Sequence, residues 1–112
     1  MFSRVLRSGR VLQGGVPAGR LEETATGFRF TYAPAFLASS NPPVSLTLPK
    51  RPEPYEAPHL FPFFVSLLAE GALAEEQCRR LRIDGRDHFG RLLQTAGGDT
   101  IGSVQVELED GP

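Results

Sequence analysis

The sequence has a single cysteine, a single lysine, no tryptophan and no long hydrophobic run. With Cys78 alone, no disulfide can form within the chain, which is typical of proteins of the reducing cytosol. The N-terminal stretch MFSRVLRSGRVL has no signal-peptide core because arginine interrupts it, and no segment approaches the roughly 20 apolar residues of a membrane span. We therefore expect a soluble, cytoplasmic protein that does not contact a membrane.

An excess of positive charge is also missing. The formal net charge is −1, from 12 basic and 13 acidic residues, and all of the basic residues except Lys50 are arginines. These arginines form no basic run of the kind that follows a phosphate backbone. The charge pattern argues against direct binding to nucleic acid.

Groups that could carry catalysis are equally scarce. His59 and His88 have no metal-ligand spacing to Cys78 or to an acidic residue. Cys78 has no activating base beside it, and we interpret it as a small buried hydrophobic residue of a helix. The glycine pairs at 14–15 and 97–98 do not complete a phosphate-binding pattern. The sequence therefore predicts a protein that is not an enzyme and that needs neither a metal nor a cofactor.

The length of 112 residues suits a single domain, residues 1–112, and its first half has the signature of β-strands. In GFRFTYA, the residues Phe28, Phe30 and Tyr32 share one face, with the period of two that a half-buried strand needs. Further strands are predicted at 4–7, 9–15 and 16–23.

Two less regular stretches follow. VSLTLP, residues 44–49, repeats the alternation and predicts a strand in which Val44, Leu46 and Leu48 point inward. PKRPEPYEAP, residues 49–58, contains prolines that favour an extended backbone and cannot join the interior of a sheet. We interpret this segment as a stiff connector, with a proline-rich ligand for another domain as the alternative.

The second half of the chain favours helices. Pro62 suits the first turn of a helix, and the pair Glu75–Arg79 supports helical structure further on. Asp87 is expected to cap a second helix, HFGRLLQTA, that Gly97 ends, and a closing strand is predicted at 102–110. The predicted fold class is α+β, with a small, mainly antiparallel sheet and two helices in the C-terminal half.

The most apolar stretch is HLFPFFVSLLAEG, residues 59–71. On a helical wheel, a group of apolar side chains falls within an arc of about 100°, the width of a core-facing stripe. These residues are Phe61, Phe64, Val65, Leu68 and Ala72. Phe63 falls about 160° from Phe61, beside Ser66 and Glu70 on the polar side. We predict that Phe63 is an exposed anchor for a protein partner, unless the preceding loop folds back over it.

Four blocks in this order resemble a known family: FRFTYAPAFLAS, VSLTLP, FPFFVSLLAEG and DHFGRLLQTAGGDTIGSVQV. They are similar to the N-terminal subdomain of the HipA-type serine/threonine kinases, the toxins of bacterial toxin–antitoxin modules. The matching motif positions are 30–38, 44–49, 63–71 and 97–104. The resemblance extends from about Leu21 onward.

The chain departs from the family pattern in three respects. Ser66 stands where the family often has asparagine, and Thr47 replaces its usual serine. Ala69 replaces a proline, so we expect the helix to continue past Leu68. The sequence also stops at Pro112, where a HipA toxin would continue into its kinase core, so no catalytic residue of the family can be carried over.

A protein of this kind resembles HipS, the small member of tripartite HipBST modules. The resemblance implies an antitoxin that binds a HipT- or HipA-type kinase and inhibits it by covering the active-site cleft. It also implies a HipB-like DNA-binding protein as the third component of the module. We expect Phe63 to make the contact, with Phe61 and Tyr55 as second choices and with Ser66 and Glu70 beside it. The alternatives are a non-inhibitory structural adaptor or split-gene subdomain of such a kinase, and an unrelated small domain.

Overall fold

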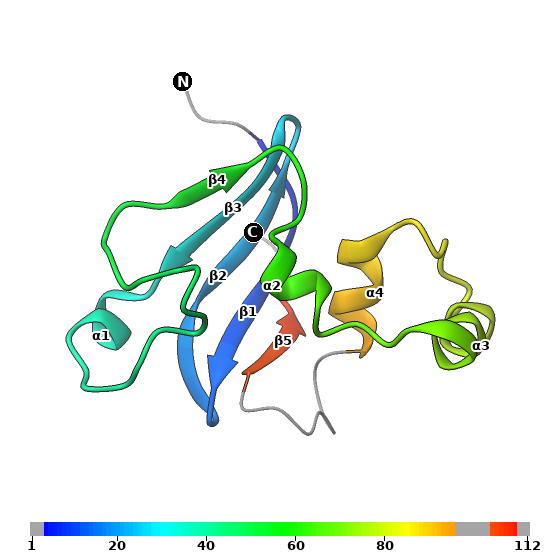
Figure 1. Cartoon of the computed structure of the whole chain (residues 1–112). Coiled ribbons are helices and arrows are strands. Elements are labelled where there is room, and N and C mark those ends of the chain that lie inside the picture. Colours follow the sequence, from blue (N-terminus) through cyan, green and yellow to red (C-terminus); the bar gives the residue numbers. More distant parts are fainter. Residues whose placement is uncertain (1–3, 96–103, 110–112) are drawn as a thin grey trace.

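The computed structural model describes residues 4–95 and 104–109. Within this part of the chain, five strands form one antiparallel sheet with the spatial order β4-β3-β2-β1-β5 (Figure 1). The strands are β1 (Val5–Gln13), β2 (Val16–Thr24), β3 (Gly27–Tyr32), β4 (Tyr55–Ala57) and β5 (Val104–Leu108). The α+β fold with a mainly antiparallel sheet is confirmed.

The turn between β1 and β2 consists of Gly14 and Gly15, whose φ angles are 57° and 81°. Two successive positive φ angles match a type I′ hairpin turn, and its twist suits the flanking strands. In β3, the side chains of Phe30 and Tyr32 are buried on one face, as the alternation predicts. The predicted strands at 4–7 and 9–15 are in fact one strand, β1, which has an irregular register between Val5 and Arg7.

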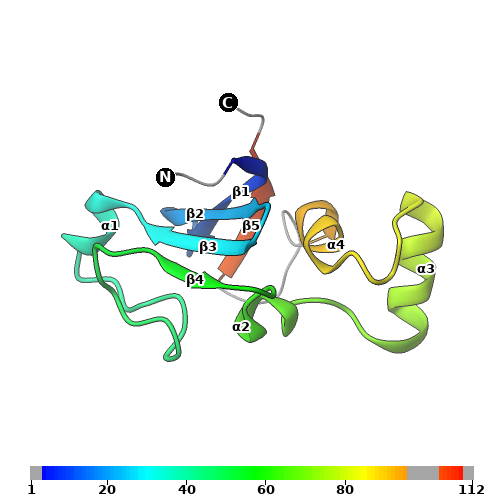
Figure 2. The same ribbon diagram turned by 90° about the horizontal axis from the view of Figure 1, so that it is seen from above.

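Four helices accompany the sheet in the described residues: α1 (Pro34–Leu37), α2 (Pro62–Val65), α3 (Gly71–Leu81) and α4 (His88–Thr95). Figure 2 shows α4 between the sheet and α3, and α3 at the far end of the molecule. Asp87 caps α4 as predicted, because its Oδ1 accepts a hydrogen bond of 3.1 Å from the Gly90 N–H. The predicted end of this helix at Gly97 lies outside the described residues.

The prediction that the helix beginning at Pro62 continues past Leu68 is wrong. α2 ends at Val65, and α3 begins only at Gly71, so the C-terminal half holds three described helices rather than two. A contact across 22 residues holds the chain within the break, where the Ala69 carbonyl accepts a 2.8 Å hydrogen bond from the buried guanidinium of Arg91. Gly71 then adopts φ 62°, a left-handed conformation that glycine tolerates at little cost.

The strand predicted at 44–49 is also wrong. Ser45 and Leu48 form an isolated bridge that closes a turn, and Leu46 at the tip is 93% exposed instead of pointing inward. Val44 and Leu48, on either side of the tip, are buried as expected. The proline-rich segment stays out of the sheet interior, but it supplies the short edge strand β4, which pairs with β3.

The core lies between one face of the sheet, α2, α4 and the 44–48 turn. Its fully buried large side chains are Phe30, Phe36, Phe64, Phe89, Leu21, Leu92, Val11 and Val106. Ala72, which the helical wheel places in the core, is exposed because the break moves α3 away from the sheet.

One hydroxyl group joins the sheet to the long segment between α1 and β4. The hydroxyl of Tyr32, on β3, donates a hydrogen bond to the Leu48 carbonyl and accepts one of 3.1 Å from the Val44 N–H. Burial raises the pKa of Tyr32, so this phenol stays protonated and keeps both bonds at neutral pH. The two ends of the 44–48 turn are thereby fixed to a single buried atom.

A charged cluster joins α4 to the sheet. The guanidinium of Arg7, on β1, donates to both carboxylate oxygens of Glu23 at 2.7 and 3.0 Å and to both of Asp87 at 2.9 Å. It also lies 5.3 Å from the ring centre of Phe89. The hydrogen bonds from Arg7 lower the pKa of Asp87, so the folded state holds this residue as the carboxylate.

We expect Tyr32→Phe to lower the free energy of unfolding by about 1–3 kcal/mol, because it leaves a buried N–H and a buried C=O without their partner. Urea denaturation measures the change. Tyr55→Phe is the matched control, since the Tyr55 hydroxyl donates to the Pro49 carbonyl at an exposed site where water can replace it. Equal losses in the two variants would contradict the role assigned to Tyr32.

We expect Asp87→Asn to destabilise the protein by on the order of 1 kcal/mol at pH 7, since the half-exposed ion pair is lost while asparagine keeps the helix cap. The folded pKa of Asp87 is depressed, so its contribution is complete above the unfolded value of about 3.9 and is lost as the pH falls through the folded value. The difference between wild type and variant should therefore shrink in urea denaturation below that pH. A difference that is constant with pH would show that the carboxylate charge is not responsible.

Candidate partner-binding site

The predicted contact residues lie at the junction that contains α2. Phe61 precedes the helix with an extended backbone, and Pro62 occupies the first turn, where its missing N–H costs nothing. The Phe61 carbonyl accepts hydrogen bonds from the N–H groups of Phe64 and Val65 at 2.9 and 3.2 Å. After the helix, the Leu67 and Leu68 N–H groups bond three residues back, at 3.2 and 3.1 Å. This short segment is therefore well defined although it contains a single helical turn.

Phe63 and Phe64 point to different sides of this turn. Phe64 is completely buried, whereas Phe63 is half-buried, and its ring meets that of Phe64 edge-on at 5.2 Å. Phe63 thus packs against the core with part of its ring and presents the rest to solvent. Its role as a partner anchor stays a prediction, with a smaller free surface than a fully exposed ring would offer.

The two second choices are more firmly engaged. Phe61 is only 8% exposed and packs in the core. Tyr55 is half-buried in β4, and the guanidinium of Arg51 covers its ring at 3.7 Å from the ring centre. Either residue would have to leave these contacts, or share them, in order to meet a partner.

Ser66 and Glu70 are both exposed, as their place on the polar side of the wheel predicts. The Ser66 hydroxyl donates a 2.5 Å hydrogen bond to the Phe63 carbonyl, which fixes the end of the turn. Glu70 occupies the N-cap position of α3 with an extended backbone, and its side chain makes no capping hydrogen bond. Phe63, Ser66 and Glu70 therefore belong to one continuous segment on the surface.

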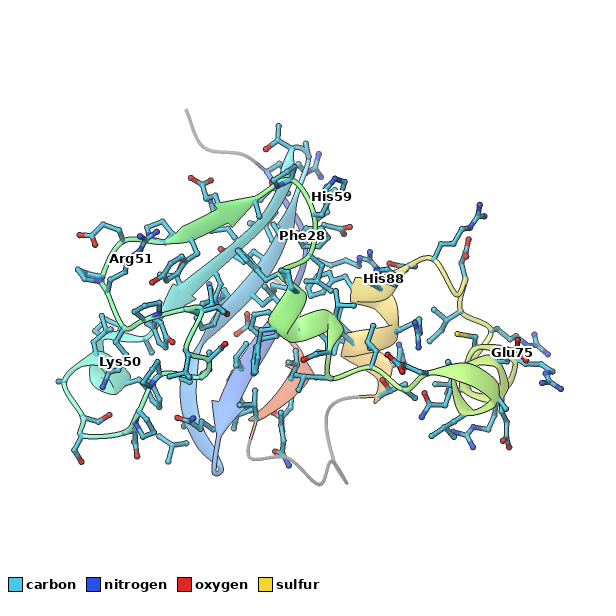
Figure 3. All side chains as sticks on the ribbon, viewed as in Figure 1. Phe28, Lys50, Arg51, His59, Glu75 and His88 are labelled. Atoms are coloured by element: carbon cyan, nitrogen blue, oxygen red, sulfur yellow. The ribbon has the colours of Figure 1, made fainter. Side chains whose placement is uncertain are left out.

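The loop that precedes β4 is held in place by its own polar contacts. The ammonium group of Lys50 donates to the carbonyls of Ser39 and Asn41, both at 2.9 Å, and lies 5.1 Å from the ring centre of Phe36. Figure 3 shows Lys50 and Arg51 along this loop, on the side of the sheet away from α3. The only lysine of the sequence thus orders the loop.

The histidines and the cysteine of the described residues lie apart from one another. His59 and His88 are exposed and come from different segments (Figure 3). Cys78 lies in a helix, α3, as predicted. It is only half-buried, however, whereas we expected a fully buried side chain. Among residues 4–95 and 104–109, no cluster of three or more histidine, cysteine, aspartate or glutamate side chains could hold a metal ion.

The face of the sheet opposite α2 carries paired charges. Salt bridges join Arg10 to Glu107 at 2.8 Å, Arg20 to Glu109 at 2.8 Å and Arg29 to Glu22 at 3.0 Å. An open hollow of about 410 Å³ lies among these groups, beside Thr31 and Pro34. Among the described residues that line the hollow, both arginines, Arg10 and Arg20, already face a carboxylate.

Comparison with known proteins decides the family. The model of the HipA N-terminal domain matches residues 9–107, nearly the whole chain. The chain belongs to the HipA N-terminal domain family. The solved structure of the N-terminal domain of HipA toxin has 34% sequence identity and a TM-score of 0.74, and the alignment covers 99% of this chain and 100% of that one. The similarity is to the N-terminal domain of HipA, which is not the catalytic kinase domain.

Two sequence relatives show this HipA N-terminal domain in chains of very different length. An uncharacterised protein of Haemophilus influenzae is 37% identical over 105 residues, which are 94% of this chain and 95% of that protein. A protein of Sinorhizobium fredii named "Putative kinase Y4mE" is 37% identical over 82 residues, which are 72% of this chain but only 19% of the relative.

None of the helices in the described residues is long and apolar enough to cross a membrane.

We expect Phe64→Ala to cost about 3–5 kcal/mol of the free energy of unfolding, because it empties a fully buried site. Phe63→Ala should cost less, since part of its ring already faces solvent. Paired urea denaturation curves measure both values. If the two losses are equal, Phe63 is a core residue and its assignment as an anchor is wrong.

Proposed function

We propose that this protein is a HipS-like antitoxin that binds a HipT- or HipA-type serine/threonine kinase and inhibits it by covering the active-site cleft. The observation that carries the proposal is the occurrence of one domain in two settings. In the Haemophilus protein the matching region makes up almost the entire chain. In Y4mE it is a minor part of a much longer protein that is named as a putative kinase.

We propose that, in the longer relative, this domain packs against the rest of the protein. If the domain is supplied as a separate chain, the same surface remains available for a noncovalent complex. A specific complex of ordinary size buries about 800 Å² on each partner, which a domain of this size can provide. The partner that fits is therefore a kinase core that lacks its own copy of this domain.

The junction around α2 is the part of this surface that supports inhibition. Its backbone is fixed by Pro62 and by the Ser66 hydroxyl, so Phe63 is presented without a large loss of conformational entropy on binding. An aromatic side chain held in this way is the usual kind of interface hot spot. In the proposed complex, Phe63 enters or covers the cleft, and Ser66 and Glu70 contact its rim.

The remaining members of the proposed complex follow from charge and from the module that the resemblance implies. The chain has a net charge of −1, and the arginines on the outer sheet face are paired with acids, so we propose no direct contact with DNA. A HipB-like protein would supply DNA binding in a ternary complex in the cytoplasm.

A structural adaptor is the second candidate, and the partial burial of Phe63 is the observation that favours it. A ring that already packs on Phe64 offers less surface for insertion into a cleft. In this case the chain completes the kinase by occupying the position of the missing domain, without blocking its active site.

Titration of the purified kinase core with this protein tests the proposal. We expect autophosphorylation to fall and to reach its minimum near one equivalent, and Phe63→Ala should require at least about tenfold more protein for the same effect. Phe28→Ala, which removes another half-buried phenylalanine, is the matched control and should inhibit like the wild type once its folding is verified.

Two other outcomes would change the conclusion. Unchanged or faster autophosphorylation together with binding would support the adaptor and overturn inhibition. Inhibition that Phe63→Ala leaves intact would keep the antitoxin function but remove Phe63 from its mechanism.

A further inference from the structure

We infer that Leu46, at the tip of the 45–48 turn, is a second anchor that inserts into an apolar pocket of the same kinase partner. This inference rests on the proposed function, because it assumes that the partner docks on the side of the molecule that carries α2. It adds a contact site that the α2 junction does not include.

The exposure of Leu46 is the starting point. Its side chain is 93% exposed, against 56% for Leu73 on α3 and 54% for Leu108 on β5. A single exposed leucine is common on protein surfaces and does not by itself indicate a binding site. What distinguishes Leu46 is how rigidly the chain presents it.

The turn that carries Leu46 is closed by several hydrogen bonds. The Leu48 N–H donates to the Ser45 carbonyl at 3.0 Å, and the Thr47 N–H donates to the Ser45 hydroxyl at 3.2 Å. The hydroxyl oxygens of Ser45 and Thr47 are also 2.8 Å apart. The polar groups on both sides of Leu46 are thus bonded to each other, so the tip presents mainly its apolar side chain.

The base of the turn is fixed to the sheet. Val44 and Leu48 are buried, and the hydroxyl of Tyr32 is bonded to the backbone of both. The tip of the loop therefore stands on a rigid support, and binding through Leu46 orders very little additional chain. The whole loop between α1 and β4, residues 38–54, contains no helix or strand, and loops as long as this are uncommon in compact domains and are usually functional.

The position of the turn connects it with the α2 junction. Figures 1 and 2 show the loop between α1 and β4 on the same side of the sheet as α2. The core agrees, because Val44 and Leu48 belong to the same buried cluster as Phe61 and Phe64. One partner surface can therefore meet both Leu46 and Phe63.

An interface of ordinary size needs more contact residues than the α2 junction supplies. A stable complex buries about 800 Å² and involves about 20–30 residues on each side, far more than the single turn of α2 contains. The 45–48 turn is the neighbouring element that adds the most exposed large hydrophobic side chain among the described residues. Its expected counterpart on the kinase is an apolar pocket of leucine size with polar groups at the rim, which would meet Ser45 and Thr47.

The test is the affinity of the purified kinase core for the wild type, for Leu46→Glu and for two matched controls, measured by isothermal titration calorimetry. Leu73→Glu and Leu108→Glu place the same charge at other exposed leucines. We expect Leu46→Glu to raise the Kd at least about tenfold, as for an interface hot spot, and both controls to bind like the wild type. Thermal unfolding should be unchanged by Leu46→Glu, because the side chain has almost no contacts to lose.

The outcomes separate the inference from the function on which it rests. If the wild type binds and Leu46→Glu binds equally well, the second anchor is wrong and the proposed function stands. If Leu73→Glu alone weakens binding, the partner docks on α3, and Leu46 is not an anchor. If the wild type does not bind the kinase, both proposals fail. Weakened binding by Leu46→Glu without inhibition by the wild type would support the anchor and overturn the antitoxin mechanism.

Discussion

The arrangement of this molecule depends most on the two hydrogen bonds that the Tyr32 hydroxyl makes. Tyr32 lies on β3, near the edge of the sheet, and its hydroxyl bonds to the backbone at both ends of the 44–48 turn. The ring beneath it stacks on Phe36 at 5.8 Å and meets Phe30 edge-on at 4.8 Å. One residue thus orders the sheet, the core and the long loop together. Because the hydroxyl is buried, water cannot take over its role.

At the other end of the domain, two arginines make long-range hydrogen bonds that play the same role as those of Tyr32. Arg7 holds the start of α4 against β1 and β2, and Arg91 captures the Ala69 carbonyl and so places the start of α3. Both side chains connect positions that are far apart in the sequence. A domain with a small sheet and short helices gains much of its definition from such contacts, since the helices are too short to be stable alone.

This dependence on distant contacts explains what the sequence could and could not predict. The alternation in β3 and the cap at Asp87 are local patterns, and both are confirmed. The break between α2 and α3 includes the bond from Arg91 to the Ala69 carbonyl, and Arg91 lies outside residues 62–81, so a wheel drawn on that segment does not contain this contact. The strand β4 forms because β3 offers it a partner, and the prolines on either side of it gave no sign of this pairing.

The candidate site shows the same limit in a different form. Leu46 fits a period of two between buried neighbours, and an inward orientation was therefore the natural reading of that pattern. A tight turn with both ends anchored produces the same spacing while reversing the central side chain. For Phe63, the helical wheel predicted an exposed ring, whereas the structure has it half-buried, because the ring packs edge-on against Phe64.

The position of α3 has a consequence for how such proteins can evolve. Within Gly71–Leu81 no side chain is buried, and the helix packs against α4 and not against the sheet. Selection for a stable fold therefore acts only weakly on this helix, whose residues can drift or be recruited without cost to the core. The sequence of α3 can therefore change while the sheet and its core stay the same.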